Sequence, residues 1–150
     1  VEARVLSTLQ DSGIVRLKDV GCLPDGRLYL CMEYLEGETL ERRLSRLSRL
    51  PAAQALELAR QMATTLDRIH RDQILHRDLK PANIMIVRDS QAQGGELARL
   101  LDFGIAKLLS PDSLSRTGQP VGTPLYMSPE QGDAKAALSD RSDVYQLGLV

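Results

Sequence analysis

The chain has 150 residues, of which 43% are hydrophobic and 26% are charged, a composition ordinary for a globular protein. Its 19 Lys and Arg residues nearly balance 20 Asp and Glu residues, and this even charge argues against a nucleic-acid or polybasic membrane binder. No apolar run approaches the roughly 20 residues that a membrane helix needs. The two cysteines, Cys22 and Cys31, are too few for a disulfide scaffold, and we expect both to be buried free thiols.

An antiparallel hairpin is predicted near the start of the chain. Apolar residues within 1–10 recur at helical spacing and indicate the end of a helix. Two strand-like runs follow, over 14–23 and 27–32, and the Pro-Asp-Gly sequence of 24–26 between them is typical of a turn. The two cysteines therefore fall on opposite arms of the hairpin.

Two helices are predicted next. Thr39 can cap a short helix, because its hydroxyl can accept a hydrogen bond from a backbone amide of the first turn. Pro51 stands where a longer helix begins, since its missing N–H costs nothing at the first helical position. The apolar residues of the first helix are Leu40, Leu44 and Leu47, and those of the second are Ala55, Leu58, Ala59, Met62, Leu66 and Ile69.

The remainder of the chain is predicted to consist of short strands, long irregular segments and a final helix. Strands are predicted at 74–75, 84–87 and 97–101, and a polar loop at 91–96. Residues 102–131 show poor periodicity with frequent Gly, Pro, Ser and Thr, which is typical of a functional or disordered segment. Residues 142–150 predict a buried helix.

Two short motifs carry the residue types that phosphoryl transfer needs. The first is His-Arg-Asp-Leu-Lys-Pro-Ala-Asn over 76–83, and the second is Asp-Phe-Gly over 102–104. Asp78 can accept a proton from a hydroxyl and Lys80 can neutralise a phosphate. Asn83 and Asp102 can ligate a hard cation, which prefers oxygen donors.

These motifs, followed by Ser-Pro-Glu at 128–130, resemble the C-terminal half of a protein kinase. Segments 122–131 and 141–148 resemble the eukaryotic-like Ser/Thr kinases of bacteria in particular. The resemblance implies an α+β, protein-kinase-like two-lobed fold, truncated at both ends. Residues 1–35 are then a remnant of the N-lobe, and residues 36–150 are the C-lobe through the activation segment.

The catalytic roles follow from this resemblance. Asp78 is implied as the catalytic base that orients the substrate hydroxyl, and Lys80 as a contact of the γ-phosphate. Asn83 and Asp102 are implied as the Mg²⁺ ligands. Thr123 is implied to bridge Asp78 and Lys80 in the substrate loop and to favour Ser or Thr acceptors.

Structural roles follow in the same way. His76 and Phe103 are implied to stack in the hydrophobic spine of the family, and Gly104 lets the backbone turn. Asp143 is implied to anchor the catalytic loop from the start of a buried helix. Glu130 is expected to lack the Arg with which the family pairs it, at some cost if it is buried.

The resemblance also places the nucleotide. Met32 is implied as the gatekeeper, and the backbones of Glu33 and Leu35 as hydrogen-bond partners of adenine. Met85 and Leu40 complete an apolar floor under the adenine. The expected cofactors are ATP and Mg²⁺, or Mn²⁺ in its place.

Regulation by phosphorylation is also predicted. Arg77, beside the predicted base, belongs to a kinase type in which this arginine needs an anionic partner. Thr117 and Ser115 lie between Asp102 and Glu130 and are the predicted autophosphorylation sites. A phosphate there adds about −2 charge and can order the loop against Arg77.

The sequence departs from a complete kinase at both ends. It has no Gly-rich loop of the G-x-G-x-x-G kind and no Val-Ala-Ile-Lys segment before Glu2, which stands where the family carries the Glu that pairs with the ATP-binding Lys. There is no initiator Met or signal peptide at Val1. We therefore expect an excerpt that is a poor catalyst alone.

Three functions remain open at this stage. The leading one is a Ser/Thr protein kinase with protein substrates, possible kinase–kinase contact for trans-autophosphorylation, and a cytoplasmic location, with no membrane segment in this chain. The second is a pseudokinase or regulatory scaffold. The third is a small-molecule phosphotransferase, against which the Gly-Thr-Pro-Leu-Tyr sequence of 122–126 argues.

Overall fold

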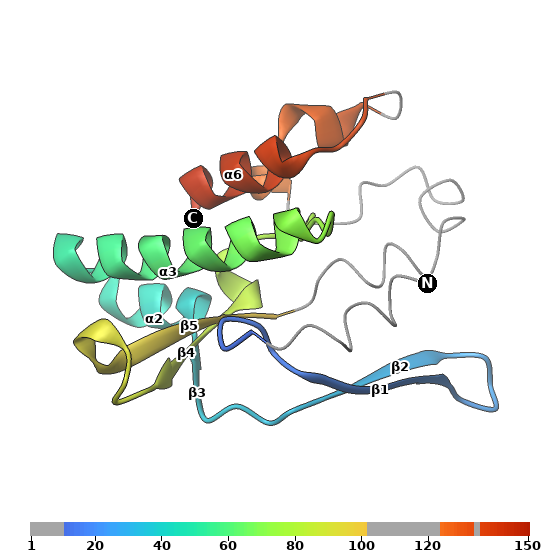
Figure 1. Ribbon diagram of the computed structural model, residues 1–150, viewed down its shortest axis with the longest axis horizontal. Coiled ribbons are helices and arrows are strands. Elements are labelled where there is room, and N and C mark those ends of the chain that lie inside the picture. The colour runs from blue at the N-terminus through green and yellow to red at the C-terminus, as the bar shows by residue number, and fades with distance from the viewer. Residues whose placement is uncertain (1–10, 102–123, 134–135) are drawn as a thin grey trace.

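The computed structural model describes residues 11–101, 124–133 and 136–150, and all elements below lie in these ranges (Figure 1). Two antiparallel sheets are present there, one of order β1-β2 and one of order β3-β4-β5. The strands are β1 (Leu17–Cys22), β2 (Leu28–Met32), β3 (Gly37–Thr39), β4 (Ile84–Arg88) and β5 (Glu96–Leu100). The α-helices are α2 (Leu40–Leu47), α3 (Ala52–Arg71) and α6 (Asp140–Leu149). Short 3₁₀ turns are η1 (Pro81–Asn83), η2 (Gln93–Gly95), η3 (Pro124–Tyr126) and η4 (Pro129–Gly132).

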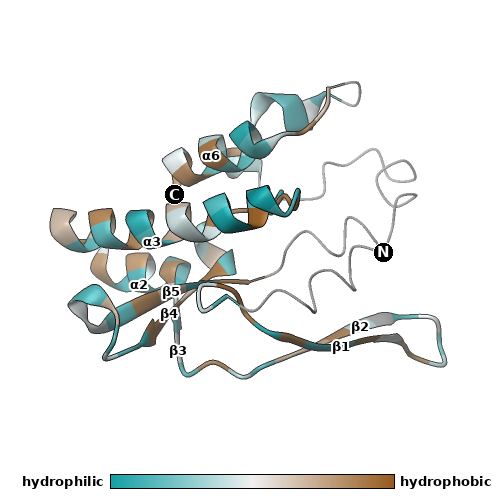
Figure 2. Cartoon of the chain, viewed as in Figure 1, coloured by the Kyte–Doolittle hydropathy of each residue, from teal (hydrophilic) through white to brown (hydrophobic). Residues whose placement is uncertain are grey.

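Helix α3 is the element around which the described part is arranged. It contacts β5 on one side and α6 on the other, so it separates the three-stranded sheet from α6 (Figure 1). Its apolar positions alternate with hydrophilic ones along the helix (Figure 2), as the helical spacing predicts. Pro51 precedes the helix as its N-cap, and Ala52 is the first helical residue.

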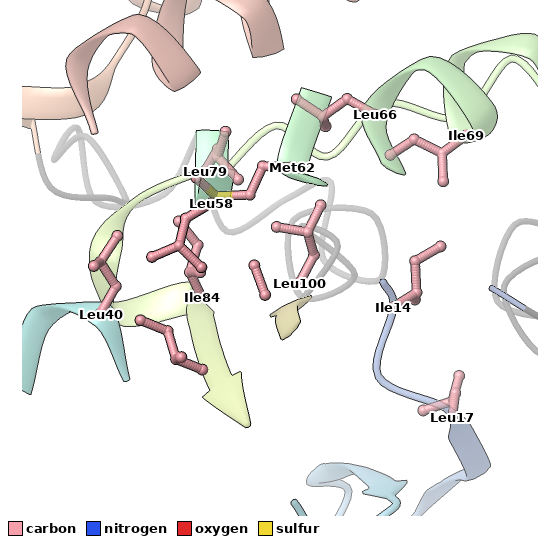
Figure 3. Packing of buried hydrophobic residues seen from close by; sticks show 12 residues of the cluster. Ile14, Leu17, Leu40, Leu58, Met62, Leu66, Ile69, Leu79, Ile84 and Leu100 are labelled. Atoms are coloured by element: carbon pink, nitrogen blue, oxygen red, sulfur yellow. The ribbon is translucent and has the colours of Figure 1, made fainter. Parts of the chain in front are cut away.

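The hydrophobic core lies between α3, α2 and the strands (Figure 3). Its buried members are Ile14, Leu17, Leu40, Leu58, Met62, Leu66, Ile69, Leu79, Ile84, Ile86, Ala98 and Leu100. Each large apolar side chain buried in this way stabilises the fold by ~1.5–3 kcal/mol. Leu79 belongs to the motif at 76–83, so the predicted catalytic loop is joined directly to the core.

An ion-pair cluster fixes α2 to both outer strands of the larger sheet. Arg43 Nε lies 2.9 Å from Glu38 Oε1 in β3, and Arg43 Nη1 lies 2.8 Å from Glu96 Oε2 in β5. The hydrogen bond from Arg43 is the main reason that the pKa of Glu96 is below its ordinary value. Thr39 caps α2, as predicted, because its hydroxyl accepts from the Arg42 amide at 3.2 Å.

The hairpin prediction is confirmed, but the expected burial of its cysteines is wrong. Strand β1 pairs antiparallel with β2, Cys22 opposite Leu28 and Cys31 opposite Asp19. Both cysteines are free and exposed. Cys31 shares the alternate positions of β2 with exposed Tyr29, on the face opposite the one from which Val20, Leu30 and Met32 pack against the core. Cys22 is the last residue of β1, next to the turn.

Three other parts of the described structure differ, wholly or in detail, from what the sequence predicts. The predicted strand at 74–75 is wrong, because Ile74 instead donates its amide to the Ile69 carbonyl and closes the end of α3. Strand β3 was not predicted, since its sequence Gly-Glu-Thr has no strand pattern. Helix α6 is confirmed, but its fully buried residues are polar, namely Ser142, Asp143 and Gln146. Among the described residues, no helix is both long and apolar enough to cross a bilayer.

Replacing Leu66 with Ala tests the central position of α3. Leu66 is 2% exposed, so the truncation removes apolar contacts and leaves a cavity. We expect the free energy of unfolding to fall by about 2–5 kcal/mol. Denaturant unfolding followed by circular dichroism measures the change.

The matched control is Leu56→Ala on the same helix, where the side chain is 71% exposed. We expect this variant to unfold within about 0.5 kcal/mol of the unchanged chain. Equal losses in the two variants would mean that α3 does not bury the face described above.

Candidate functional site

The loop at residues 76–80 brings the predicted catalytic side chains together. Lys80 Nζ lies 2.9 Å from Asp78 Oδ2. Asn83 Nδ2 donates to the Asp78 carbonyl oxygen at 2.8 Å and to Asp78 Oδ2 at 3.0 Å. A carboxylate, an ammonium and a carboxamide therefore meet at one point, held between the core residue Leu79 and strand β4.

Asp143 at the start of α6 holds this loop in place. Its carboxylate is 0% exposed. Oδ2 accepts from the His76 amide at 2.8 Å, and Oδ1 accepts from the Arg77 amide at 2.8 Å. His70 Nε2 of α3 lies 2.8 Å from Oδ2. A buried carboxylate is tolerated only when its oxygens have such partners.

The Arg77 backbone has a conformation that residues other than glycine rarely adopt. Its φ is 66°, in the left-handed region. Such a residue costs of order 1–3 kcal/mol and persists only where its surroundings enforce it. The bond from the Arg77 amide to Asp143 supplies part of that enforcement. His76 is fully buried, and its Nε2 lies 2.9 Å from the Leu101 carbonyl oxygen.

In the predicted hinge, Glu33 is held by bonds to both its backbone amide and its side chain. The Glu33 amide donates to the Arg16 carbonyl at 3.0 Å. Its side chain accepts from the Arg16 amide at 2.7 Å and pairs with Arg99 of β5. Burial raises the pKa of Glu33, but these two partners outweigh burial and hold the pKa below its ordinary value. Met32 and Leu35 flank Glu33 and are both half-buried.

Glu130, which was expected to lack an Arg partner, accepts a hydrogen bond from a serine. Ser142 Oγ of α6 donates to Glu130 Oε1. This bond is the main cause that lowers the pKa of Glu130 below its ordinary value. The half-buried carboxylate is thus stabilised in its charged form by a hydroxyl of the same helix that holds the catalytic loop.

A family model described as the protein kinase domain matches residues 1–150. The chain belongs to the protein kinase family. Serine/threonine-protein kinase pkn2 of Myxococcus xanthus is 45% identical over 99% of this kinase chain and 18% of its own length. Serine/threonine-protein kinase PknH of Mycobacterium tuberculosis is 38% identical over 99% of the chain and 22% of its own length.

A solved structure shares the fold of this kinase chain. The kinase domain of Mycobacterium tuberculosis PknI, solved as a mutant with one cysteine replaced by alanine, superposes with a TM-score of 0.74 at 27% identity. The match covers 96% of this chain and 50% of that one. The chain thus spans about half of a solved kinase domain and less than a quarter of the two curated relatives. The expected α+β protein-kinase-like fold is confirmed.

Several predicted site residues lie outside the described residues. They are Glu2, Asp102, Phe103, Gly104, Ser115, Thr117 and Thr123. Their roles stay predictions from the sequence. Met85 lies in β4, half-buried and opposite Thr39 of β3, and Leu40 is 4% exposed in the core.

Among the described residues, Asn83 can offer an oxygen to a magnesium ion. Within residues 11–101, 124–133 and 136–150, no three His, Cys, Asp or Glu side chains gather as a metal site. Asn83 directs its Nδ2 to Asp78, which leaves its Oδ1 as an oxygen donor. One amide oxygen suits Mg²⁺, which is bound through few protein ligands together with phosphates and water.

Four residues of the kinase site were missed by sequence reasoning: His70, Arg99, Gln131 and Gln146. Two had a readable signal. Gln146 is three residues after Asp143 and therefore shares its helix face. Arg99 is the one charged residue in the apolar run 97–101. His70 and Gln131 have no recognisable signal in the sequence. The partner of His70 is 73 residues away along the chain, and the Arg77 carbonyl that Gln131 binds is 54 residues away.

Ser142→Ala tests the bond to Glu130 through the pH dependence of stability. Because the pKa of Glu130 is lower in the folded chain, the bond stabilises the fold above the ordinary pKa of 4.5. That stability is lost as pH falls through the folded pKa. We expect wild type to be more stable than the variant at pH ~6 and the difference to shrink by pH ~3.

Unfolding midpoints measured across this pH range provide the test. Ser139→Ala is the control for the helix cap, because Ser139 and Ser142 form the capping box of α6 and this change leaves the Ser142 hydroxyl that binds Glu130 in place. A difference between wild type and Ser142→Ala that stays constant with pH would contradict the assigned bond.

Proposed function

We propose that the protein is a Ser/Thr protein kinase that transfers the γ-phosphoryl group of MgATP to hydroxyl groups of protein substrates. The observation that carries this proposal is the convergence of Lys80 and Asn83 on the Asp78 carboxylate. Phosphoryl transfer requires a group that orients the hydroxyl, a cation at the phosphate and ligands for the metal. The relatives named Ser/Thr kinases support the same activity.

In this proposal each residue has a separate task. Asp78 accepts the hydrogen bond of the substrate hydroxyl and takes its proton as the hydroxyl oxygen bonds to the γ-phosphorus, while the bond from this phosphorus to the bridging oxygen breaks and ADP leaves with that oxygen. Lys80 pairs with Asp78, and it would also neutralise the transferring phosphate. Asn83 Oδ1 and Asp102 would hold Mg²⁺, which spreads the charge of the phosphates. Thr123 would select Ser and Thr acceptors.

The nucleotide is proposed to bind next to residues 32–35. The Glu33 carbonyl is fixed by the bonds of its amide and side chain, so it is ready to accept from adenine. Met32 and Met85 would cover the ring, and Glu2 would orient the ATP-binding Lys. We also propose the division into an N-lobe part, 1–35, and a C-lobe part, 36–150. Use of cellular ATP favours a cytoplasmic location.

Asp78→Asn tests the assigned base. The change keeps the size of the side chain and one oxygen that can accept from Lys80 and Asn83, but it removes the negative charge that pairs with Lys80 and the capacity to take a proton. In the full product of the gene, we expect transfer of labelled γ-phosphate to a protein substrate to fall about 10²–10⁴-fold. ATP binding measured by calorimetry should stay within about threefold, because Asp78 does not hold the adenine.

Asp67→Asn is the matched control, since Asp67 pairs with Arg71 on the surface of α3, away from the loop. It should leave the rate unchanged. Wild type that binds ATP without transferring phosphate would favour the pseudokinase alternative. Phosphate found only on a small alcohol, offered beside the protein, would favour the phosphotransferase alternative.

Thr117 is proposed as the main autophosphorylation site and Ser115 as the second. A phosphate on this segment would pair with Arg77 and order the substrate loop. We expect phosphopeptide mapping of active full-length protein to find Thr117 modified, and Thr117→Ala to lower activity at least about tenfold. Active enzyme with unmodified Thr117 would refute this assignment.

A further inference from the structure

Two glutamines join the peptide groups on either side of Asp78. The Leu79 amide donates to Gln146 Oε1 at 3.1 Å. Gln146 Nε2 then donates to Gln131 Oε1 at 3.0 Å, and Gln131 Nε2 donates to the Arg77 carbonyl at 2.7 Å. Together with the backbone from Arg77 to Leu79, these bonds form a closed ring with Asp78 in it, called the glutamine ring below.

The two ends of this path fix the orientation of both side-chain amides. A backbone N–H can only donate, so Gln146 must turn its oxygen toward Leu79. Its nitrogen then faces Gln131, whose own nitrogen meets the Arg77 carbonyl, which can only accept. Reversing either amide would set two donors or two acceptors against each other. The ring therefore has one arrangement.

Burial makes the ring costly to open. Gln146 is 2% exposed and Leu79 is 0% exposed, so water cannot replace the bond between them, whereas Gln131 and Arg77 are half-buried. A buried polar group that is left unpaired destabilises the fold by its full desolvation penalty. Hydrogen bonds in series also strengthen one another. The loss of one glutamine should therefore disturb the whole ring.

The ring also completes the enforcement of the Arg77 conformation. Asp143 holds the amide of Arg77 and Gln131 holds its carbonyl, so both backbone groups of this left-handed residue are bound from outside the loop. Gln131 Oε1 accepts from the Ser128 amide as well, at 3.0 Å. The segment 128–131 is thereby bonded to the peptide groups that aim Asp78.

We propose that Gln131 and Gln146 are positioning residues that aim the Asp78 carboxylate and couple its aim to the placement of segment 128–131. This segment follows the predicted substrate residue Thr123 in the chain, and the same bonds that hold residues 128–131 also hold the peptide groups beside the base. The inference rests on the proposed kinase activity for its catalytic consequence, whereas the coupling itself is a property of the ring.

Kinetics of Gln131→Leu, Gln146→Leu and the double variant test the catalytic consequence in the full product of the gene. Leucine keeps the approximate size but cannot hydrogen-bond. We expect each single variant to lower kcat, per folded molecule, about 10- to 100-fold. The KM for ATP should change less than about twofold, because the ring does not touch residues 32–35. The kcat of the double variant should lie within about threefold of the kcat of the slower single variant, because either change opens the same ring.

Gln61→Leu is the matched control. Gln61 is also buried and also bridges two backbone groups, accepting from the Ala98 amide at 2.8 Å and donating to the Glu96 carbonyl at 3.0 Å. It lies on α3, outside the ring. We expect it to lower the unfolding midpoint as the ring variants do and to leave kcat unchanged. Equal loss of kcat in Gln61→Leu, or multiplied losses in the double variant, would overturn the proposal.

Hydrogen exchange at the Leu79 amide tests the coupling without any need for activity. Gln131 does not contact this amide, so Gln131→Leu can speed its exchange only through Gln146. We expect exchange at least about tenfold faster in both single variants and unchanged exchange in Gln61→Leu. Protection that survives Gln131→Leu would overturn the ring. Inactive wild type with a confirmed ring would instead refute the kinase proposal alone.

Discussion

A single buried carboxylate determines the shape of the candidate active site. Asp143 has no exposed surface, and its two oxygens meet the amides of His76 and Arg77 and the ring of His70. A charge in this position is stable only with all of these partners, and the loop keeps its left-handed residue only with the carboxylate. Each condition enforces the other. The site is therefore a property of two distant segments rather than of the loop motif alone.

The core and the site depend on each other through α3. One face of this helix supplies Leu66 and Ile69 to the core, and its last turn brings His70 to Asp143. Leu79 then ties the loop back into the same core between Lys80 and Asp78. Helix α6 lies on the side of α3 opposite the sheet (Figure 1), where Leu147 packs against the core while Asp143 and Gln146 hold the loop by hydrogen bonds. Apolar burial positions the helices, and directional bonds then fix the loop between them.

Local signals made much of this arrangement predictable. The hairpin, the Thr39 cap, α3 and the residues of the loop could be derived from turn sequences, spacing and motif order. Features that depend on a partner far along the chain could not. Strand β3 exists only because β4 offers a pairing edge, and Cys31 is exposed on the hairpin face opposite the one that packs against the core. Gln131 has no distinguishing feature in the sequence, and its importance arises from Arg77 and Gln146. The bond from Ser142 to Glu130 was not predicted either, because these two residues are 12 positions apart in the chain.

The separation between the loop and its anchor also has a consequence for biosynthesis. His76 leaves the ribosome 67 residues before the carboxylate that fixes it. At about 5–20 residues per second, translation takes roughly 3–13 s to cover that stretch. During this interval α3 and the sheet can already pack, while the His76–Asp78 backbone has no helix to bind. The nascent polypeptide thus acquires its structural scaffold first, and the geometry for chemistry arrives only with α6.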